Sequence, residues 1–93
     1  MRTKTTENSR YLDKATALIY GDRQKEYGKA KDNIENIAKL WSVMLGIEIT
    51  VEQVCLCMIQ VKAARLLITP THDDSWIDIA GYVGVMDKVN HDE

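Results

Sequence analysis

The stretch Asp73-Asp74-Ser75-Trp76-Ile77-Asp78-Ile79-Ala80-Gly81-Tyr82 opens an apolar helical segment that continues to Met86 and contains the carboxylate of Asp78. A carboxylate among apolar residues must be neutralised, paired or bound to a metal, because an unpaired buried charge is costly. Upstream, Lys62 and Arg65 interrupt a second apolar run. We therefore expect these opposite charges either to pair with one another or to hold a ligand.

The composition limits the class of protein. The 93 residues are enough for a single helical domain over 1–93, with disordered ends at about 1–7 and 91–93, and domains of this size often gain burial by forming homo-oligomers. A net charge of −2 with mixed signs predicts no specific nucleic-acid partner. The chain shows neither a membrane-spanning apolar run nor the apolar stretch of a signal peptide, so we predict a cytoplasmic protein without a membrane partner.

The cysteines and histidines do not form a metal-binding pattern. Cys55 and Cys57 are two residues apart on a predicted helix, so their side chains diverge, and we expect core thiols rather than a disulfide or metal ligands. His72 and His91 lie in a predicted loop and in the C-terminal tail. We therefore expect no zinc site.

Apolar periodicity predicts four helices and no strands. Their ranges are about 8 or 9 to 20, 29 to 45, 50 to 68 and 73 to 90. The second helix carries an apolar stripe from Ala30 to Leu45 and ends at Gly46. In the third, Thr50 and Gln53 have the spacing of a capping box, and the near-continuous apolarity predicts a central position.

Short connections between these helices favour a compact antiparallel four-helix bundle, an all-α fold. Gly81 and Gly84 are unfavourable inside a helix, so their presence suggests the close approach of another helix or of a ligand, and we favour a helix. Asp74 and Asp78 share one face of the fourth helix, and Lys62 and Arg65 share a face of the third. If these faces meet, the charges pair without any ligand. Alternatively, the long stems of Lys62 and Arg65 carry their charges to solvent.

The segment from Gly21 to Gly28 is dense in charge and carries Arg23, Glu26 and Tyr27. It is either a binding element or a solvated turn. Asn33 lies about two turns after Glu26 if the second helix extends back that far.

A resemblance rests on a set of short motifs distributed between about Tyr11 and Val89. They are Gly21-Asp22-Arg23, Glu26-Tyr27-Gly28, Asn33, Ile37-Ala38, Trp41, Lys62-Ala63-Ala64-Arg65, Asp74-Ser75 and Asp78-Ile79-Ala80-Gly81-Tyr82. The pattern resembles a family of small phage-encoded helical proteins of undefined function. The fourth helix is also similar to that of the MazG-like nucleoside triphosphate pyrophosphohydrolases, which place acidic clusters on neighbouring helices to hold magnesium against a triphosphate.

The likeness to the MazG-like enzymes implies roles for individual residues. Magnesium prefers carboxylate, phosphate and water oxygens, so Asp78, Asp74 and Glu26 are its implied ligands, with Asp78 and Asp74 as the implied catalytic residues. The implied contacts to a nucleotide or phosphate ligand come from Lys62, Arg65, Arg23, Tyr27 and Asn33. The chain departs from the enzyme pattern, since it contains no Glu-Glu-x-x-Glu motif and Ser75 stands three residues before Asp78.

Two functional hypotheses remain from the sequence. The first is a MazG-like protein that binds a nucleotide or phosphate ligand and, if an enzyme, is a magnesium-dependent pyrophosphohydrolase. The second is a non-enzymatic phage accessory protein that binds and inhibits a host factor, such as a defence component or its nucleotide signal.

Overall fold

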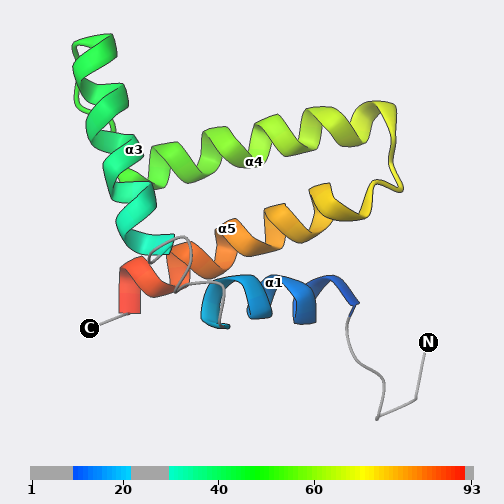
Figure 1. Ribbon diagram of the computed structural model, residues 1–93. Coiled ribbons are helices and arrows are strands. Elements are labelled where there is room, and N and C mark those ends of the chain that lie inside the picture. Colours follow the sequence, from blue (N-terminus) through cyan, green and yellow to red (C-terminus); the bar gives the residue numbers. More distant parts are fainter. Residues whose placement is uncertain (1–9, 22–29, 92–93) are drawn as a thin grey trace.

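The computed structural model describes residues 10–21 and 30–91, and this part of the chain forms four α-helices and no strand. The helices are α1 (Arg10–Tyr20), α3 (Ala30–Leu45), α4 (Val51–Ile68) and α5 (Asp73–His91), as Figure 1 shows. The all-α prediction is confirmed, although His91 belongs to α5 rather than to a disordered tail. No helix in the described ranges is long and apolar enough to cross a membrane.

The connection between α3 and α4 is fixed by local hydrogen bonds. Gly46 adopts a left-handed φ of 73°, which glycine tolerates at the end of a helix. The Ser42 hydroxyl accepts a hydrogen bond from the Ile49 amide at 2.8 Å, and this bond holds the connection against α3. The Gln53 amide donates to Thr50 Oγ1 at 3.1 Å, and the Thr50 amide donates to Gln53 Oε1 at 2.9 Å. The predicted capping box at the start of α4 is thereby confirmed.

Helix α5 is the central element, because it packs against each of the other three helices. The α4–α5 pair is antiparallel, as expected, but α1 runs parallel to α5. Tyr11 Oη donates to Asp73 Oδ1 at 2.6 Å where both helices begin, and Tyr20 Oη donates to Asp87 Oδ2 at 3.3 Å near their ends. The short connection between α4 and α5 makes these two helices antiparallel. Helices α1 and α5 are far apart in the chain, so no tight turn fixes the direction of α1 relative to α5.

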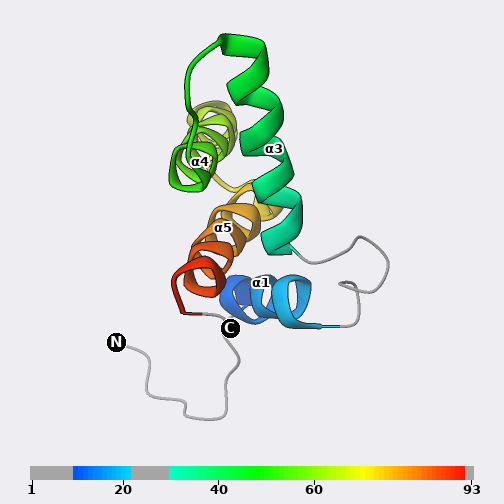
Figure 2. The same ribbon diagram turned by 90° about the vertical axis from the view of Figure 1, so that its left-hand side faces the viewer.

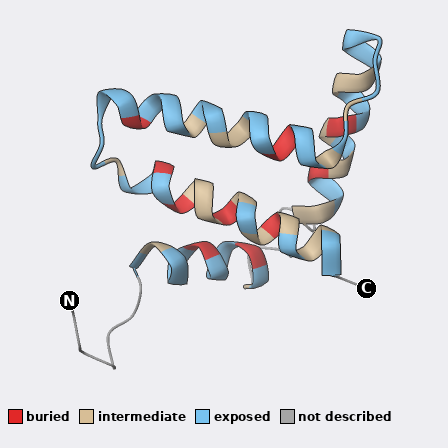
Figure 3. Ribbon diagram, turned by 180° about the vertical axis from the view of Figure 1, so that it is seen from behind, coloured by how far each residue is buried: buried red, intermediate tan, exposed pale blue. Residues whose placement is uncertain are grey.

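Helix α3 crosses one end of the α4–α5 pair rather than lying along it (Figures 1 and 2). Its first half packs on the other helices, whereas its C-terminal half extends past α4. Met44 and Leu45, which we expected on the buried stripe, are exposed because no described helix covers this end. The predicted central position of α4 is also wrong, since its outer face is open to solvent (Figure 3).

The main hydrophobic cluster of the core joins all four helices. Its buried members are Ile19, Ile34, Ala38, Val54, Cys55 and Val85. A methyl group on Gly84 would lie 3.2 Å from Ile19 Cγ1, so the absence of a side chain lets α1 approach α5. The close approach of another helix that we expected at this glycine is thereby confirmed.

Burial raises the pKa of the Cys55 thiol, and the negative charge of Glu52 raises it further. Cys57 is exposed, so the expectation of two core thiols is wrong for this residue.

Candidate functional site

The charged residues of the two apolar runs form an ion pair between α4 and α5. Lys62 Nζ lies 3.0 Å from Asp78 Oδ2. The Lys62 side chain is 22% exposed and that of Asp78 is 34% exposed, so the pair is shielded but still reached by water. Its two ends lie on the antiparallel helices α4 and α5. The expectation that the opposite charges pair is confirmed for Lys62 and Asp78.

Asp78 also lines a cavity of about 230 Å³ formed by α1, α3 and α5. The other polar side chains of this lining are those of Asn33 and Tyr82. The remaining walls are Leu18, Ile19, Ala30, Ile34, Gly81 and Val85. Burial raises the pKa of the Tyr82 phenol, the positive charge of Lys62 opposes this rise, and the negative charge of Asp78 reinforces it. An amide, a carboxylate and a neutral phenol thus lie on an otherwise apolar lining, which we call the Asp78 cavity.

Other residues expected at the site lie elsewhere or outside the described ranges. Asp74 and Arg65 are exposed, and neither lines the Asp78 cavity. Arg65 follows Lys62 by three residues, which rotates it by about 60° around the helix axis and toward solvent. Arg23, Glu26 and Tyr27 lie outside the described residues. Among the predicted residues the structure therefore brings together Asn33, Asp78 and Lys62.

The carboxylates within 10–21 and 30–91 do not form a metal centre by themselves. No three His, Cys, Asp or Glu side chains in these ranges are grouped so that they could hold a metal ion. Asp78 has a cationic partner, which offsets the negative charge that would attract magnesium. Magnesium ligation by Asp78, Asp74 and Glu26 remains a prediction.

Ser75 has a structural role at the start of α5. It is 1% exposed, and its Oγ lies 2.7 Å from His72 Nδ1. The Ser75 amide donates to the same nitrogen at 3.2 Å, so the His72 ring caps the helix. The residue three before Asp78 is thereby enclosed by the helix end and does not reach the Asp78 cavity.

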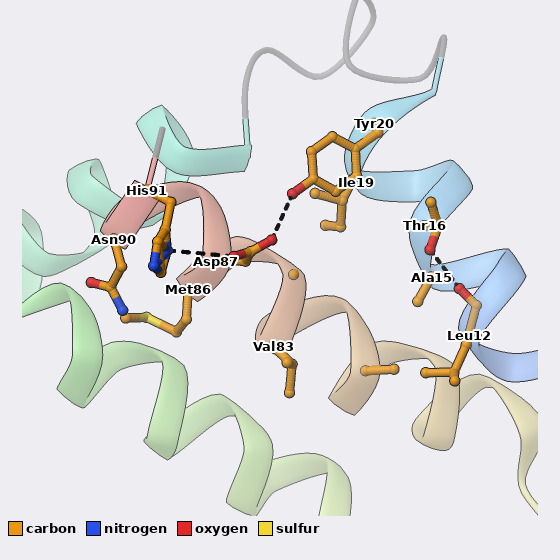
Figure 4. A pocket seen from close by; sticks show the side chains of 12 residues that line it. Leu12, Ala15, Thr16, Ile19, Tyr20, Val83, Met86, Asp87, Asn90 and His91 are labelled. Atoms are coloured by element: carbon orange, nitrogen blue, oxygen red, sulfur yellow. Dashed lines mark hydrogen bonds and ion pairs between the residues drawn. The ribbon is translucent and has the colours of Figure 1, made fainter. Parts of the chain in front are cut away.

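A second and larger cavity, of about 490 Å³, lies between α1 and α5 (Figure 4). At its polar edge Asp87 lies between two partners. One carboxylate oxygen accepts from Tyr20 Oη at 3.3 Å, and the other lies 3.5 Å from His91 Nδ1. Lys88 Nζ sits 4.8 Å from the centre of the Tyr20 ring. This cavity was not predicted, because Tyr20 and Asp87 are 67 residues apart and no sequence pattern joins them. The four-residue spacing of Asp87 and His91 is a signal that could have indicated its polar edge.

The fold and the site define an all-helical protein with a shielded lysine–aspartate pair beside a small mixed cavity. The chain belongs to the family described as Domain of unknown function (DUF6378), which matches residues 10–90. It is 44% identical over 79 residues to the Gene 55 protein of Mycobacterium phage L5, and 41% identical over 78 residues to the Gene 55 protein of Mycobacterium phage D29.

Each of these alignments covers 84% of this chain, but only 51% of the L5 protein and 52% of the D29 protein. The chain thus spans about half the length of the curated relatives it matches. No solved structure matches it. The comparisons confirm the expected relationship to phage-encoded proteins of undefined function, and the likeness to MazG-like enzymes stays a prediction.

Proposed function

We propose that the chain binds a nucleotide or a related phosphate ligand at the Asp78 cavity. The observation that carries this proposal is the placement of Asn33, Asp78 and Tyr82 on one otherwise apolar lining. An amide and a carboxylate together donate and accept hydrogen bonds, which the edge of a nucleobase requires. The apolar walls of the cavity suit the flat faces of the base. Lys62, which is bonded to Asp78, supplies positive charge next to this lining.

The size of the cavity suits part of a nucleotide. At about 230 Å³ it is smaller than the roughly 300–1,000 Å³ of pockets that enclose drug-sized ligands. A base or a sugar would fill it, and the phosphates would extend outside. Phosphate oxygens would then compete with Asp78 for the ammonium group of Lys62.

Binding is better supported than hydrolysis. In the described residues Asp78 is paired with a lysine, and no group of three acidic or other metal-binding side chains accompanies it. A magnesium-dependent pyrophosphohydrolase would need further ligands, for which Asp74 and Glu26 are the candidates from sequence. We therefore propose ligand binding first and magnesium-dependent hydrolysis as its alternative, and one experiment tests both.

The test is calorimetric titration of nucleoside mono-, di- and triphosphates with and without magnesium, with pyrophosphate release measured in parallel. We expect saturable binding that Asn33→Ala and Asp78→Asn weaken by about tenfold or more, the equivalent of one or two lost hydrogen bonds. Asn36→Ala and Asp13→Asn are the matched controls, because both native residues are exposed and outside the cavity. No binding across the panel, or equal losses in the controls, would refute the proposal. Magnesium-dependent pyrophosphate release would establish the enzymatic alternative.

The non-enzymatic accessory function is a second candidate, favoured by the outer face of α4. Leu56, Leu67 and Ile68 are exposed on this helix, and apolar surface that no other described helix covers is available to a protein partner. For this function we expect Leu67→Asp to abolish capture of a host protein while the melting temperature stays the same. A capture experiment from host lysate that recovers no reproducible partner counts against it.

A further inference from the structure

Asp78 supplies the Asp78 cavity with a hydrogen-bond acceptor. It forms an ion pair in which Lys62 Nζ lies 3.0 Å from Asp78 Oδ2. An ionised carboxylate accepts hydrogen bonds at about four lone-pair sites and donates none. Lys62 uses one of these sites and holds the side chain in place. The other sites can be filled only by groups that donate, so Asp78 selects for donors on a ligand.

Space for a ligand adjoins this carboxylate. Gly81 lines the same cavity and follows Asp78 by three residues, which puts both on one side of α5. Gly81 is buried, but a methyl group built on it would lie 4.0 Å from Ile19 Cδ1, an ordinary contact. The backbone of α5 is therefore open to the close approach of a flat ring beside Asp78.

Two further polar groups line the cavity, and both can donate. Asn33 on α3 carries a side-chain amide, which has two N–H donors and one carbonyl acceptor. Burial raises the pKa of the Tyr82 phenol, which therefore keeps its proton at neutral pH and can donate as well. The lining thus combines an acceptor-only carboxylate with neutral donors on otherwise apolar walls.

Guanine differs from the other common bases because two adjacent groups on one of its edges are donors. Its N1–H and its N2 amino group can both donate to a single carboxylate, and the neighbouring O6 accepts. Adenine and cytosine place an unprotonated ring nitrogen beside their amino group, so a carboxylate oxygen would face a lone pair. Uracil and thymine place one N–H between two carbonyl oxygens. Guanine alone therefore offers two donors to Asp78 and, beside them, an acceptor to the amide of Asn33.

We propose that the Asp78 cavity binds the guanine base of a nucleotide, with N1–H and the N2 amino group donating to Asp78 and O6 accepting from Asn33. This inference rests on the proposed nucleotide binding and adds the identity of the base. The apolar walls contact the faces of the ring, and Lys62 orients the carboxylate. A different base leaves the carboxylate without its donors, and unpaired polar groups at a shielded site lower the affinity.

The first test is calorimetric titration of the full chain with guanosine, inosine and adenosine triphosphates in the absence of magnesium. Inosine lacks only the N2 amino group, so the first two ligands differ in one donor and share sugar and phosphates. We expect guanosine triphosphate to bind about tenfold more tightly than the other two, the usual effect of one hydrogen bond to a charged group. Equal affinities, or a preference for adenosine, overturn the inference and leave nucleotide binding intact. No binding of any of the three contradicts both proposals.

The second test exchanges the hydrogen-bonding pattern of Asp78. Xanthine carries a carbonyl oxygen where guanine carries the N2 amino group. The amide introduced by Asp78→Asn donates to that oxygen and accepts from N1–H, so this variant should bind xanthosine triphosphate more tightly than guanosine triphosphate, reversing the wild-type order. Asp13→Asn is the matched control, because Asp13 is exposed and outside the cavity, and it should keep the wild-type order.

An Asp78→Asn variant that still prefers guanosine triphosphate overturns the inference. Circular dichroism checks that both variants remain helical. The comparison of guanosine with inosine needs no substitution, so it decides the question even if Asp78→Asn fails to fold.

Discussion

Lys62 Nζ lies 3.0 Å from Asp78 Oδ2 and joins α4 to α5 beside the candidate ligand cavity. Both side chains are partly shielded from water, so the contribution of this pair to stability should lie between those of exposed and of fully buried ion pairs. Exposed ion pairs contribute roughly 0–1 kcal/mol, whereas removing one partner of a fully buried pair costs roughly 3–5 kcal/mol. The pair therefore has a structural role whether or not a ligand also uses it.

Replacing Lys62 with methionine should lower the free energy of unfolding by about 1–2 kcal/mol, because Asp78 keeps its charge but loses its partner. Adding Asp78→Leu should recover most of this loss, since the double variant removes both charges and retains apolar contacts. Urea denaturation of the four chains gives the coupling energy. Additive effects of the two substitutions would show that the pair contributes nothing beyond its separate side chains.

The two glycines of α5 should respond differently to alanine. A methyl group on Gly81 would lie 4.0 Å from Ile19 Cδ1, an ordinary contact, so Gly81→Ala should stabilise the protein by up to about 1 kcal/mol through helix propensity. On Gly84 it would lie 3.2 Å from Ile19 Cγ1 and 3.7 Å from Ile19 Cβ. Because the β-branched side chain of Ile19 is stiff, Gly84→Ala should destabilise by about 1 kcal/mol. Thermal unfolding measures both changes. The same Gly84→Ala penalty in an Ile19→Ala background would contradict this explanation.

Removal of the Thr50 hydroxyl should destabilise the start of α4. The Gln53 amide donates to this hydroxyl at 3.1 Å, so Thr50→Ala should cost about 1 kcal/mol, the usual contribution of an N-cap side chain. Thr71→Ala is a suitable control, because Thr71 is an exposed threonine outside the helices. Chemical denaturation of both variants measures the effect, and equal losses would argue against a specific role for the cap.

The protein should lose stability in alkaline solution. Burial is the main cause that raises the pKa of Cys55 above its ordinary value of 9.0 and that of Tyr82 above 10.0. Since both groups ionise more readily in the unfolded chain, the stability they contribute is complete below the ordinary values and falls as the pH rises through the folded-state values. Denaturation curves at increasing pH should show this decline, and Tyr82→Phe should make it smaller. A decline that is unchanged in both Tyr82→Phe and Cys55→Ala would assign it to other groups.

The sequence predicted those features of the fold that depend on neighbouring residues. The Thr50–Gln53 capping box has a fixed spacing, so the structure forms it at the two residues that the pattern predicts. The Lys62–Asp78 pair was predictable because each charge stands in an otherwise apolar helix, and such charges need partners. The C-terminal ends of α1, α3 and α4, at Tyr20, Leu45 and Ile68, followed from the same local signals, whereas the predicted starts at 8 or 9 and at 29 lie outside the described residues.

Features that depend on contacts distant in sequence were not predictable in this way. The direction of α1 relative to α5 depends on how Ile19 fits against Gly84, which no local pattern encodes. The prediction that the apolar stripe of α3 is buried along its whole length is wrong, because periodicity shows which residues share a face but not how far along the helix a partner extends. The α1–α5 cavity was missed for the same reason.

Helix α1 packs mainly against α5, yet its Leu18 and Ile19 side chains form part of the wall of the Asp78 cavity. A local opening that detaches α1 therefore need not unfold the α4–α5 hairpin, and the backbone amides of α1 should exchange with deuterium faster than those of α5. The same opening would remove one wall of the cavity. A molecule bound there would slow exchange throughout α1, because occupancy and the docking of this helix would be thermodynamically linked.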